Sequence, residues 1–426
     1  MKRIFSCRVC VVAAGLFLLP ALRAQESAPE TNQLVTLGTL VDEALKRNPE
    51  LRVAEASIAA AQGEVVTARA YQNPEVSFTP GAKRTSPSGA PSDTFFHGTI
   101  AVGQLIEYPG KRTVRKALAE RSVAGSKLAL ESLRYQIQLR VRKAYFDLLA
   151  AQQIESLRKE QVESARVFAE AARKRVESGF ASDFEVLKGE ADFIAAQKLL
   201  RESQGRIALA NVALNTIAGR PPTAPIRVAG LLDGNLSLPG INFLDFALTN
   251  NPALQIQSVE NEKAGLTIQA TKLSRRPDFT VGPAVEFDKE EQIFGVGISI
   301  PLPLWNKRKG EIQTATAGQQ KALAETEKLR LEIVRAVTTA EQNLRTANSQ
   351  LALYTSEFRN RLRALVEQAE KSYAQSATTL LIYLDARRTY FDSLTDYNES
   401  LAKAAEARAD LESAVGVPLD FNISKP

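Results

Sequence analysis

The sequence predicts a mainly α-helical fold with a small β part, duplicated within one chain. Two stretches of about 66 residues, Arg112–Ser178 and Glu311–Ser376, contain no proline and carry apolar residues at coiled-coil spacing. Two shorter regions alternate apolar residues with small or polar ones, which is typical of strands with two different faces. These features occur in the same order in each half of the chain, and that order indicates duplication.

The duplication can be followed in matching motifs. An Asn-Pro pair at 48–49 matches a second pair at 251–252, at an offset of 203 residues. Residues 214–219 match residues 411–416 at an offset of 197. A period near 200 residues is too long for a solenoid repeat, so we interpret it as duplication of one structural half.

The N-terminal 24 residues have the features of a secretory signal: a basic start, a short apolar run and small residues before Gln25. We expect cleavage after Ala24. The alternative is an uncleaved anchor, but the apolar run is short for a spanning helix. Removal takes four basic residues, so the formal charge falls from +6 to +2 and nucleic-acid binding has no support. Cys7 and Cys10 also leave, and an exported chain without cysteine suits the envelope of a Gram-negative bacterium.

Two strand pairs are expected, at 74–107 and 277–302. Each strand is about ten residues long, which is the length that a tilted transmembrane strand requires. The last strand carries four apolar residues on one face, and we expect this face to contact lipid. The alternative is an ordinary pair of hairpins that caps a helical domain. The residues predicted to face lipid are Phe294, Val296, Ile298 and Ile300.

Each strand pair leads into a long helix through a junction with an aromatic residue and a basic cluster. The first junction is VGQLIEYPGKR (Val102–Arg112), and the second is VGISIPLPLWNKRKG (Val296–Gly310). Aligning the two junctions matches Lys111-Arg112 with Lys307-Arg308. Such residues gather where a segment leaves a membrane at headgroup level. We therefore expect interface anchors at Tyr108, Lys111, Trp305 and Lys307.

The two long stretches are expected to form helices of roughly 100 Å each, if continuous. Apolar residues that recur every seven positions predict a coiled-coil seam. Each long helix ends at a reversal, near 179–183 in the first half and near 376–379 in the second, and a returning helix follows. The seam predicted for the second long helix contains Val337, Leu344, Leu351, Phe358 and Leu365.

Four strands cannot close into a barrel, and exposed strand edges are not tolerated in lipid, so several copies must assemble. Two copies give eight strands, and three give twelve with room for a lumen. The expected fold is a long antiparallel α-helical coiled-coil barrel plus a transmembrane β-barrel, to which each protomer contributes four strands. Such an assembly is a conduit. The expected segments are a signal peptide (1–24), a first repeat (25–220), a linker (221–240), a second repeat (241–417) and a tail (418–426).

The duplicated halves, the Asn-Pro break, the junction PLPLWNKRKGE and the reversal GxxSDxEVL together resemble the outer-membrane efflux protein (TolC) family. The resemblance covers nearly all of the exported chain, and the second junction looks most like the components that serve heavy-metal RND pumps (CzcC-like). It implies a homotrimer in the outer membrane with a periplasmic helical tunnel. The implied partners are a periplasmic membrane-fusion adaptor and an inner-membrane RND pump.

The resemblance also places a periplasmic gate at the two reversals. The acidic gate position, six residues after Gly179, falls on Glu185, and the gate tyrosine falls on Tyr373. The basic position falls on Thr378, so the gate is only partly carried over. Asp183 lies in the same reversal. An alternative for Glu185 is a helix N-terminal acid that complements the helix dipole.

Other function classes have less support. The exported chain has a single histidine, His97, and no cysteine, so neither an enzyme, a cofactor site nor a metal site is expected. A periplasmic coiled-coil structural or adaptor protein would share the heptads, but it needs no alternating strands and no aromatic junctions. The expected function is a passive conduit from the periplasm to the exterior for heavy-metal cations, with drug efflux and type I protein secretion as alternatives.

Overall fold

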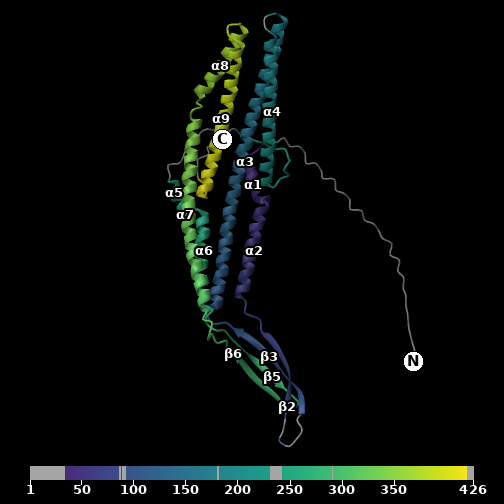
Figure 1. Ribbon diagram of the computed structural model, residues 1–426, viewed down its shortest axis with the longest axis vertical. Helices are drawn as coiled ribbons and strands as arrows, with labels where there is room; N and C mark the ends of the chain where they lie inside the picture. Colours follow the sequence, from purple (N-terminus) through teal and green to yellow (C-terminus); the bar gives the residue numbers. More distant parts are fainter. Residues whose placement is uncertain are drawn as a thin grey trace, which may run out of the picture. The chain divides into compact units, whose positions relative to one another are not determined.

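The computed structural model describes residues 34–85, 88, 93–179, 182–230, 242–289 and 291–419. The expected signal peptide, most of the first hairpin loop, half of the linker and almost all of the tail lie outside these residues. The described part follows the expected order of elements in both halves (Figure 1). No helix within these ranges is both long and apolar enough to cross a membrane.

The helices of the first repeat pack beside those of the second, and one core cluster of mainly leucine, valine and alanine runs through both. Helix α3 contacts helices of both repeats and is central to this packing. Its prediction is confirmed within one residue at each end. The helices of the first repeat are α1 (Leu37–Arg47), α2 (Pro49–Arg69), α3 (Lys111–Glu177) and α4 (Asp183–Ala218). Those of the second are α5 (Phe243–Asn250), α6 (Pro252–Leu273), α7 (Lys309–Leu351), α8 (Ser356–Ala374) and α9 (Leu380–Val415).

The Asn-Pro pairs separate α1 from α2 and α5 from α6. In both pairs the asparagine caps the second helix and the proline is its first residue. Proline fits the first turn of a helix because its missing N–H has no intrahelical partner there. Asn48 caps α2 by accepting from Glu50 N at 2.9 Å, and its amide donates to Ile217 O at the end of α4 at 3.1 Å. In the second repeat, Asn251 caps α6 in the same way and donates to Val415 O at 3.2 Å. Each buried asparagine therefore joins two helix ends.

The second long stretch, Glu311–Ser376, does not form one continuous helix. Helix α7 ends at Leu351, and α8 starts at Ser356 after Thr355 accepts from Phe358 N at 3.1 Å. Between them the Tyr354 ring packs on Tyr397 of α9, with ring centroids 5.9 Å apart. The stretch contains no proline, and its one glycine, Gly318, lies far from the break, so the interruption coincides with this tertiary contact and with neither of those residues.

The interruption also shifts the predicted seam. Val337, Leu344 and Leu351 are buried as predicted. Phe358 and Leu365, however, are 40% and 46% exposed, because the break changes which side of α8 faces the neighbouring helices. The buried positions of α8 are instead Leu362, Ala369 and Tyr373.

The strands form a four-stranded antiparallel sheet in the order β2-β3-β5-β6, and the pairing of β3 with β5 joins the two repeats. A short parallel pair, β1 (Leu34–Val35) with β4 (Arg227–Val228), lies apart from it. Because β2 and β6 are the edges of the sheet, each has one side without a strand partner among the described residues. The strands are β2 (Glu75–Thr85), β3 (Asp93–Ile106), β5 (Phe279–Phe287) and β6 (Gln292–Ser299).

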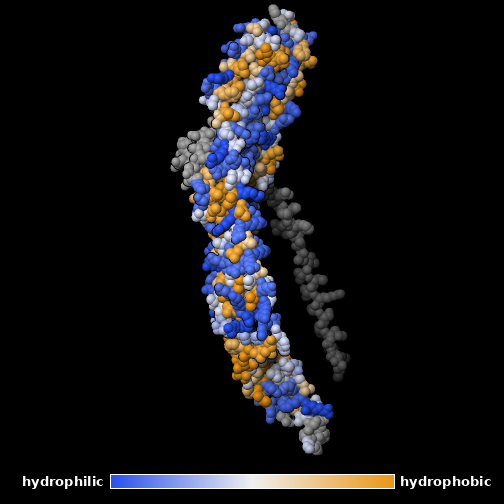
Figure 2. All heavy atoms as spheres, turned by 60° about the vertical axis from the view of Figure 1, so that its left-hand side comes forward, coloured by the Kyte–Doolittle hydropathy of each residue, from blue (hydrophilic) through white to orange (hydrophobic). Residues whose placement is uncertain are grey.

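The register gives the sheet one apolar face. Direct partners point to the same side of a sheet, and Phe78, Ile100, Val285 and Phe294 form one such row across the four strands. Figure 2 shows hydrophobic side chains gathered over the sheet. The four residues predicted to face lipid are exposed in the single chain, as is every residue of β6: Phe294 by 74%, Val296 by 72%, Ile298 by 68% and Ile300, just beyond β6, by 51%.

Candidate functional site

The first candidate site is the tip, where both long helical hairpins reverse. Gly179 after α3 and Ser376 after α8 both have left-handed backbones, with φ of 77° and 56°. Helices often end in this conformation because it lets the chain turn away while the last carbonyls stay bonded. Asp183 is the first residue of α4 and is exposed, whereas Thr378 is half-buried just before α9.

The two gate candidates from different repeats lie in contact at this tip. The hydroxyl of Tyr373 on α8 donates to Oε2 of Glu185 on α4. Burial, together with the neighbouring Glu185 carboxylate, raises the pKa of Tyr373 to about 12, so its hydroxyl keeps its proton at neutral pH. The Tyr373 ring stacks on Tyr383 of α9, with centroids 5.4 Å apart and planes at 6°. Glu185 also lies in the first turn of α4, where a carboxylate complements the helix dipole. The alternative role for this residue is therefore also compatible with the structure.

The basic side chain at the tip is Arg175, which sequence reasoning missed. Its guanidinium lies 4.7 Å from the centroid of the Tyr373 ring. It donates to Tyr373 O at 3.2 Å and to Ser376 Oγ at 3.4 Å. The resemblance pointed to Thr378 for this role, but the end of α3 brings Arg175 to the tyrosine instead. The sequence feature that could have identified Arg175 is the pair of basic residues in the last turn of α3.

An ion pair also joins the repeats, between α4 and α9. Arg387 of α9 is buried and binds Asp192 of α4 at 3.0 Å. Its guanidinium lies 5.8 Å from the centroid of Phe168 and 5.6 Å from that of Tyr383, rings that belong to a small apolar cluster at the tip. The tip is therefore held by aromatic packing together with polar contacts between the repeats, which involve Glu185, Arg175 and Arg387.

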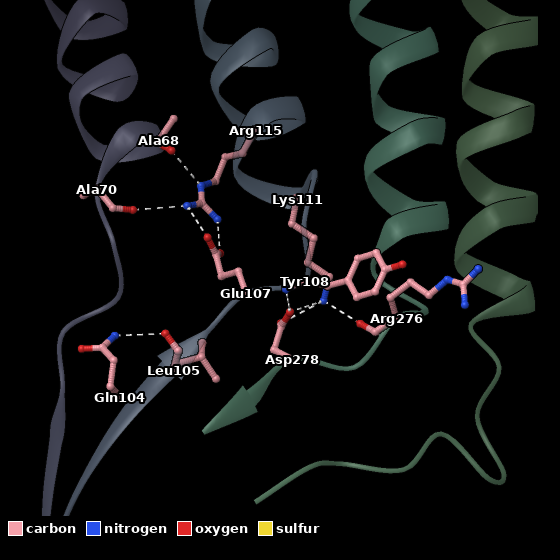
Figure 3. A network of polar contacts seen from close by, with 10 residues as sticks. All are labelled: Ala68, Ala70, Gln104, Leu105, Glu107, Tyr108, Lys111, Arg115, Arg276 and Asp278. Atoms are coloured by element: carbon pink, nitrogen blue, oxygen red, sulfur yellow. Dashed lines mark hydrogen bonds and ion pairs between the residues drawn. The ribbon is translucent and has the colours of Figure 1, made fainter. Parts of the chain in front are cut away.

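The second candidate site is the junction between β3 and α3, drawn in Figure 3. Lys111 Nζ lies 2.8 Å from both carboxylate oxygens of Asp278 and donates to Arg276 O at 2.8 Å. The backbone N–H of Tyr108 donates to the same carboxylate at 2.7 Å. Asp278 precedes β5, so these bonds tie the start of α3 to the second repeat.

Arg115 adds a tie on the other side of this junction. It forms an ion pair with Glu107 and donates to Ala68 O at 3.1 Å and Ala70 O at 3.3 Å, at the end of α2 (Figure 3). The first junction thus closes within one chain. Lys111, expected as an interface anchor, is only 17% exposed and is engaged by Asp278.

The junction between β6 and α7 is open by comparison. Trp305 is 93% exposed, and Lys307 is exposed as well. Arg308 caps α7 with a left-handed backbone, φ 52°, and pairs with Glu311 at 3.1 Å in the same turn. An aromatic side chain with so little protein contact fits the expected interface position.

Among the described residues, no group of three or more His, Cys, Asp and Glu side chains is placed to hold a metal ion. The arrangement offers a different capability. It joins two helical hairpins at a tip by breakable polar ties, and it presents an apolar sheet face at the other end of the long helices.

Comparison with known proteins agrees with this architecture. The family model for outer membrane efflux protein matches residues 40–220 and 243–417. The cobalt-zinc-cadmium resistance protein CzcC of Cupriavidus metallidurans is 25% identical over 417 residues, covering 94% of each chain. The nickel and cobalt resistance protein CnrC of the same organism is 25% identical over 358 residues, covering 82% of each.

Solved structures share the fold at low sequence identity. The structure of CusC has a TM-score of 0.76 at 16% identity and covers 90% of this chain and 92% of its own. The outer membrane protein VceC of Vibrio cholerae has a TM-score of 0.73 at 18% identity, covering 89% and 96%. Because the family model matches both repeats and most of the chain, this protein belongs to the outer membrane efflux protein family and acts in the outer membrane.

Proposed function

We propose that this protein is the outer-membrane conduit of a tripartite efflux system for heavy-metal cations. The observation that carries the proposal is the match to CzcC over 94% of each chain, supported by the match to CnrC. Both relatives are named as metal resistance proteins. In such a system, a periplasmic adaptor and an inner-membrane RND pump deliver the cargo to the conduit.

The proposed working form is a homotrimer. One chain supplies four strands with open edges at β2 and β6, and edges of this kind must be paired in lipid. Three copies supply twelve strands, which leave room for a lumen. The apolar face that carries Val296 then contacts lipid, while the face with small and polar residues lines the pore. Trp305 and Lys307 lie at headgroup level.

The conduit itself is proposed to be passive, with no catalytic or cofactor role. Selection for metal ions then belongs to the pump partner, because the exported chain has no cysteine or methionine and one histidine. The gate is proposed at the tip, where the Tyr373–Glu185 bond holds the two repeats together. Asp183, Gly179 and Thr378 belong to the same reversals.

A complementation experiment tests the cargo. A strain that keeps its metal pump and adaptor but lacks the outer-membrane component should regain tolerance to cobalt, zinc or cadmium when this protein is expressed. The second candidate cargo is a siderophore or drug, favoured by the 22% identity to the pyoverdine export protein OpmQ of Pseudomonas putida over 92% of this chain. Restored pyoverdine export without restored metal tolerance would select that alternative.

Bilayer conductance tests the gate. Glu185→Gln and Tyr373→Phe should each raise the closed-state conductance, because each weakens the tie between the repeats. The matched control is Glu190→Gln, which removes an exposed pair with Arg173, 2.5 Å long, between helices of the same repeat. The gate assignment fails if both tip variants conduct and select ions as the wild type does.

A further inference from the structure

The two strand–helix junctions correspond to each other through their helix starts. Helix α3 follows Gly110, and α7 follows Arg308, and both of these residues have left-handed backbones. Aligning them makes Lys309, and not Lys307, the counterpart of Lys111, at an offset of 198 residues. The offset at the tips is 197, so the long helices keep nearly the same alignment from end to end.

The acid that binds Lys111 also has a counterpart. Asp278 follows Pro277 and directly precedes β5, and Glu75 follows Pro74 and is the first residue of β2. The offset is 203, the same as between the two Asn-Pro breaks. The helices, linkers and strand starts on this side of the repeats therefore align without a gap, and Glu75 is the counterpart of Asp278.

Within one chain, Lys309 and Glu75 lie at opposite edges of the sheet. Lys111 and Asp278 can meet because β3 and β5 are neighbours. Lys309 follows β6, whereas Glu75 begins β2, and the sheet order is β2-β3-β5-β6. Both side chains are exposed and carry opposite charges. They become neighbours when β6 of one copy pairs with β2 of the next.

We propose that Glu75 of a second copy binds Lys309 and completes the open junction, as Asp278 completes the closed one within the chain. The inference rests on the proposed assembly of several copies and names the contact that joins them. The carbonyl of Asn73 takes the place of Arg276 O as the second acceptor. The contact is head-to-tail, so each copy donates a lysine on one side and a carboxylate on the other.

The same correspondence fixes the strand register between copies. Within the chain Gln104 lies opposite Val281. At the offsets of 198 and 203 their counterparts are Leu302, just beyond β6, and Phe78, which are 67% and 56% exposed; Leu302 continues the alternation of Ile298 and Ile300 on the apolar face. The register therefore continues that face from one copy to the next, whereas a shift by one residue would turn one strand over.

Cross-linking between engineered cysteines tests the contact directly, since the sequence has no cysteine beyond residue 10. The proposed contact is made through a long lysine side chain, so cysteines at the same two positions would be too far apart for a disulfide. A short bismaleimide can bridge that distance and is the reagent. In the outer membrane, Lys309→Cys with Glu75→Cys should give dimer and trimer bands on a denaturing gel. Each single variant should give none. As a geometry control, Lys111→Cys with Asp278→Cys should react within one chain and give no dimer or trimer band.

Charge exchange tests whether the contact stabilises the assembly. Lys309→Glu and Glu75→Lys should each lose most of the oligomer that survives mild heating in detergent, and the double variant should recover it. The matched control is Lys307→Glu, two residues away, which should keep the oligomer.

The outcomes separate the two proposals. If the wild-type protein formed no oligomer in detergent or in membranes, the proposal of a conduit built from several copies would be refuted. A stable wild-type oligomer that shows no cross-link between positions 309 and 75, and no effect of charge exchange, would overturn this contact alone. Loss on Lys307→Glu but not on Lys309→Glu would also overturn it, in favour of the simpler sequence alignment.

Discussion

The two repeats use the same atoms at their Asn-Pro breaks. Asn48 and Asn251 are both buried, both cap the following helix and both donate to the end of the returning helix of their own repeat. The glycine after each returning helix is left-handed, with φ of 70° at Gly219 and 84° at Gly416. A Cβ at either glycine would lie 2.9 Å from the neighbouring break, so both sites require glycine for space as well.

The repeats differ where they face different neighbours. Helix α3 is continuous over 67 residues, but the second repeat splits the same length into α7 and α8. The first junction is closed by Asp278, and the second is exposed around Trp305. The Asn-Pro contacts inside each repeat have stayed alike. The junctions, where the repeats meet each other or an outside surface, have diverged, and so has the break between α7 and α8, which packs on α9 of its own repeat.

The largest effect is expected on the apolar face of β6. Val296→Arg should prevent assembly, because an arginine facing lipid near the midplane costs about 2–4 kcal/mol. The matched control is Gly295→Arg, since Gly295 lies one residue away on the opposite face with open space around it. The amount of heat-modifiable oligomer in outer membranes measures both. Equal loss in the two variants would contradict the assignment of faces.

The second-largest effect is expected at the Asn-Pro breaks, where the two alanine variants should lose similar amounts of stability. Asn48→Ala and Asn251→Ala each remove a helix cap and a buried donor, so each should lower the free energy of unfolding by about 1–3 kcal/mol. Asn250→Ala is the control, because its amide bonds only within α5, to Phe246 O at 3.0 Å. Denaturant unfolding followed by circular dichroism gives the values. A large difference between the two breaks would argue against their equivalence.

Substitutions at the two left-handed residues of the tip should change stability in opposite directions. Gly179→Ala forces a Cβ into a left-handed backbone and should cost about 1–2 kcal/mol. Ser376→Gly relieves the same strain, but it also removes the contact of Arg175 with Ser376 Oγ at 3.4 Å, so a smaller gain is expected. Thermal unfolding of the two variants provides the comparison. A loss of stability in Ser376→Gly would mean that the arginine contact outweighs the strain.

The smallest effect at neutral pH is expected from Tyr373→Phe, about 1 kcal/mol, the usual net value of one hydrogen bond. The folded-state pKa of Tyr373 is raised from 10 to about 12, so its stabilising contribution is complete below pH 10 and is lost as pH rises through about 12. The melting temperatures of wild type and Tyr373→Phe should therefore converge between pH 10 and 12. A constant difference across that range would exclude a titrating Tyr373 hydroxyl.

Local sequence pattern determined the order of elements, the duplication and the apolar face of the strands. These features depend on periods of two and seven residues, on proline positions and on matching motifs, which are all visible along the chain. The gate candidates Glu185 and Tyr373 came from the family resemblance. Their contact joins residues 188 positions apart, and the fold was needed to reveal it.

Tertiary packing decided the features that have no local signal. The break between α7 and α8 depends on Tyr354 packing against α9, and the choice of Arg175 over Thr378 depends on how α3 ends beside α8. The pairing of Lys111 with Asp278 needed the β3–β5 register, and the matching starts of α3 and α7 show that Lys309 is the counterpart of Lys111. The physical reason is common to all three. A helix or strand period is set by neighbouring residues, whereas the partner of a charge or an aromatic ring is set by chain segments that meet only in the folded protein.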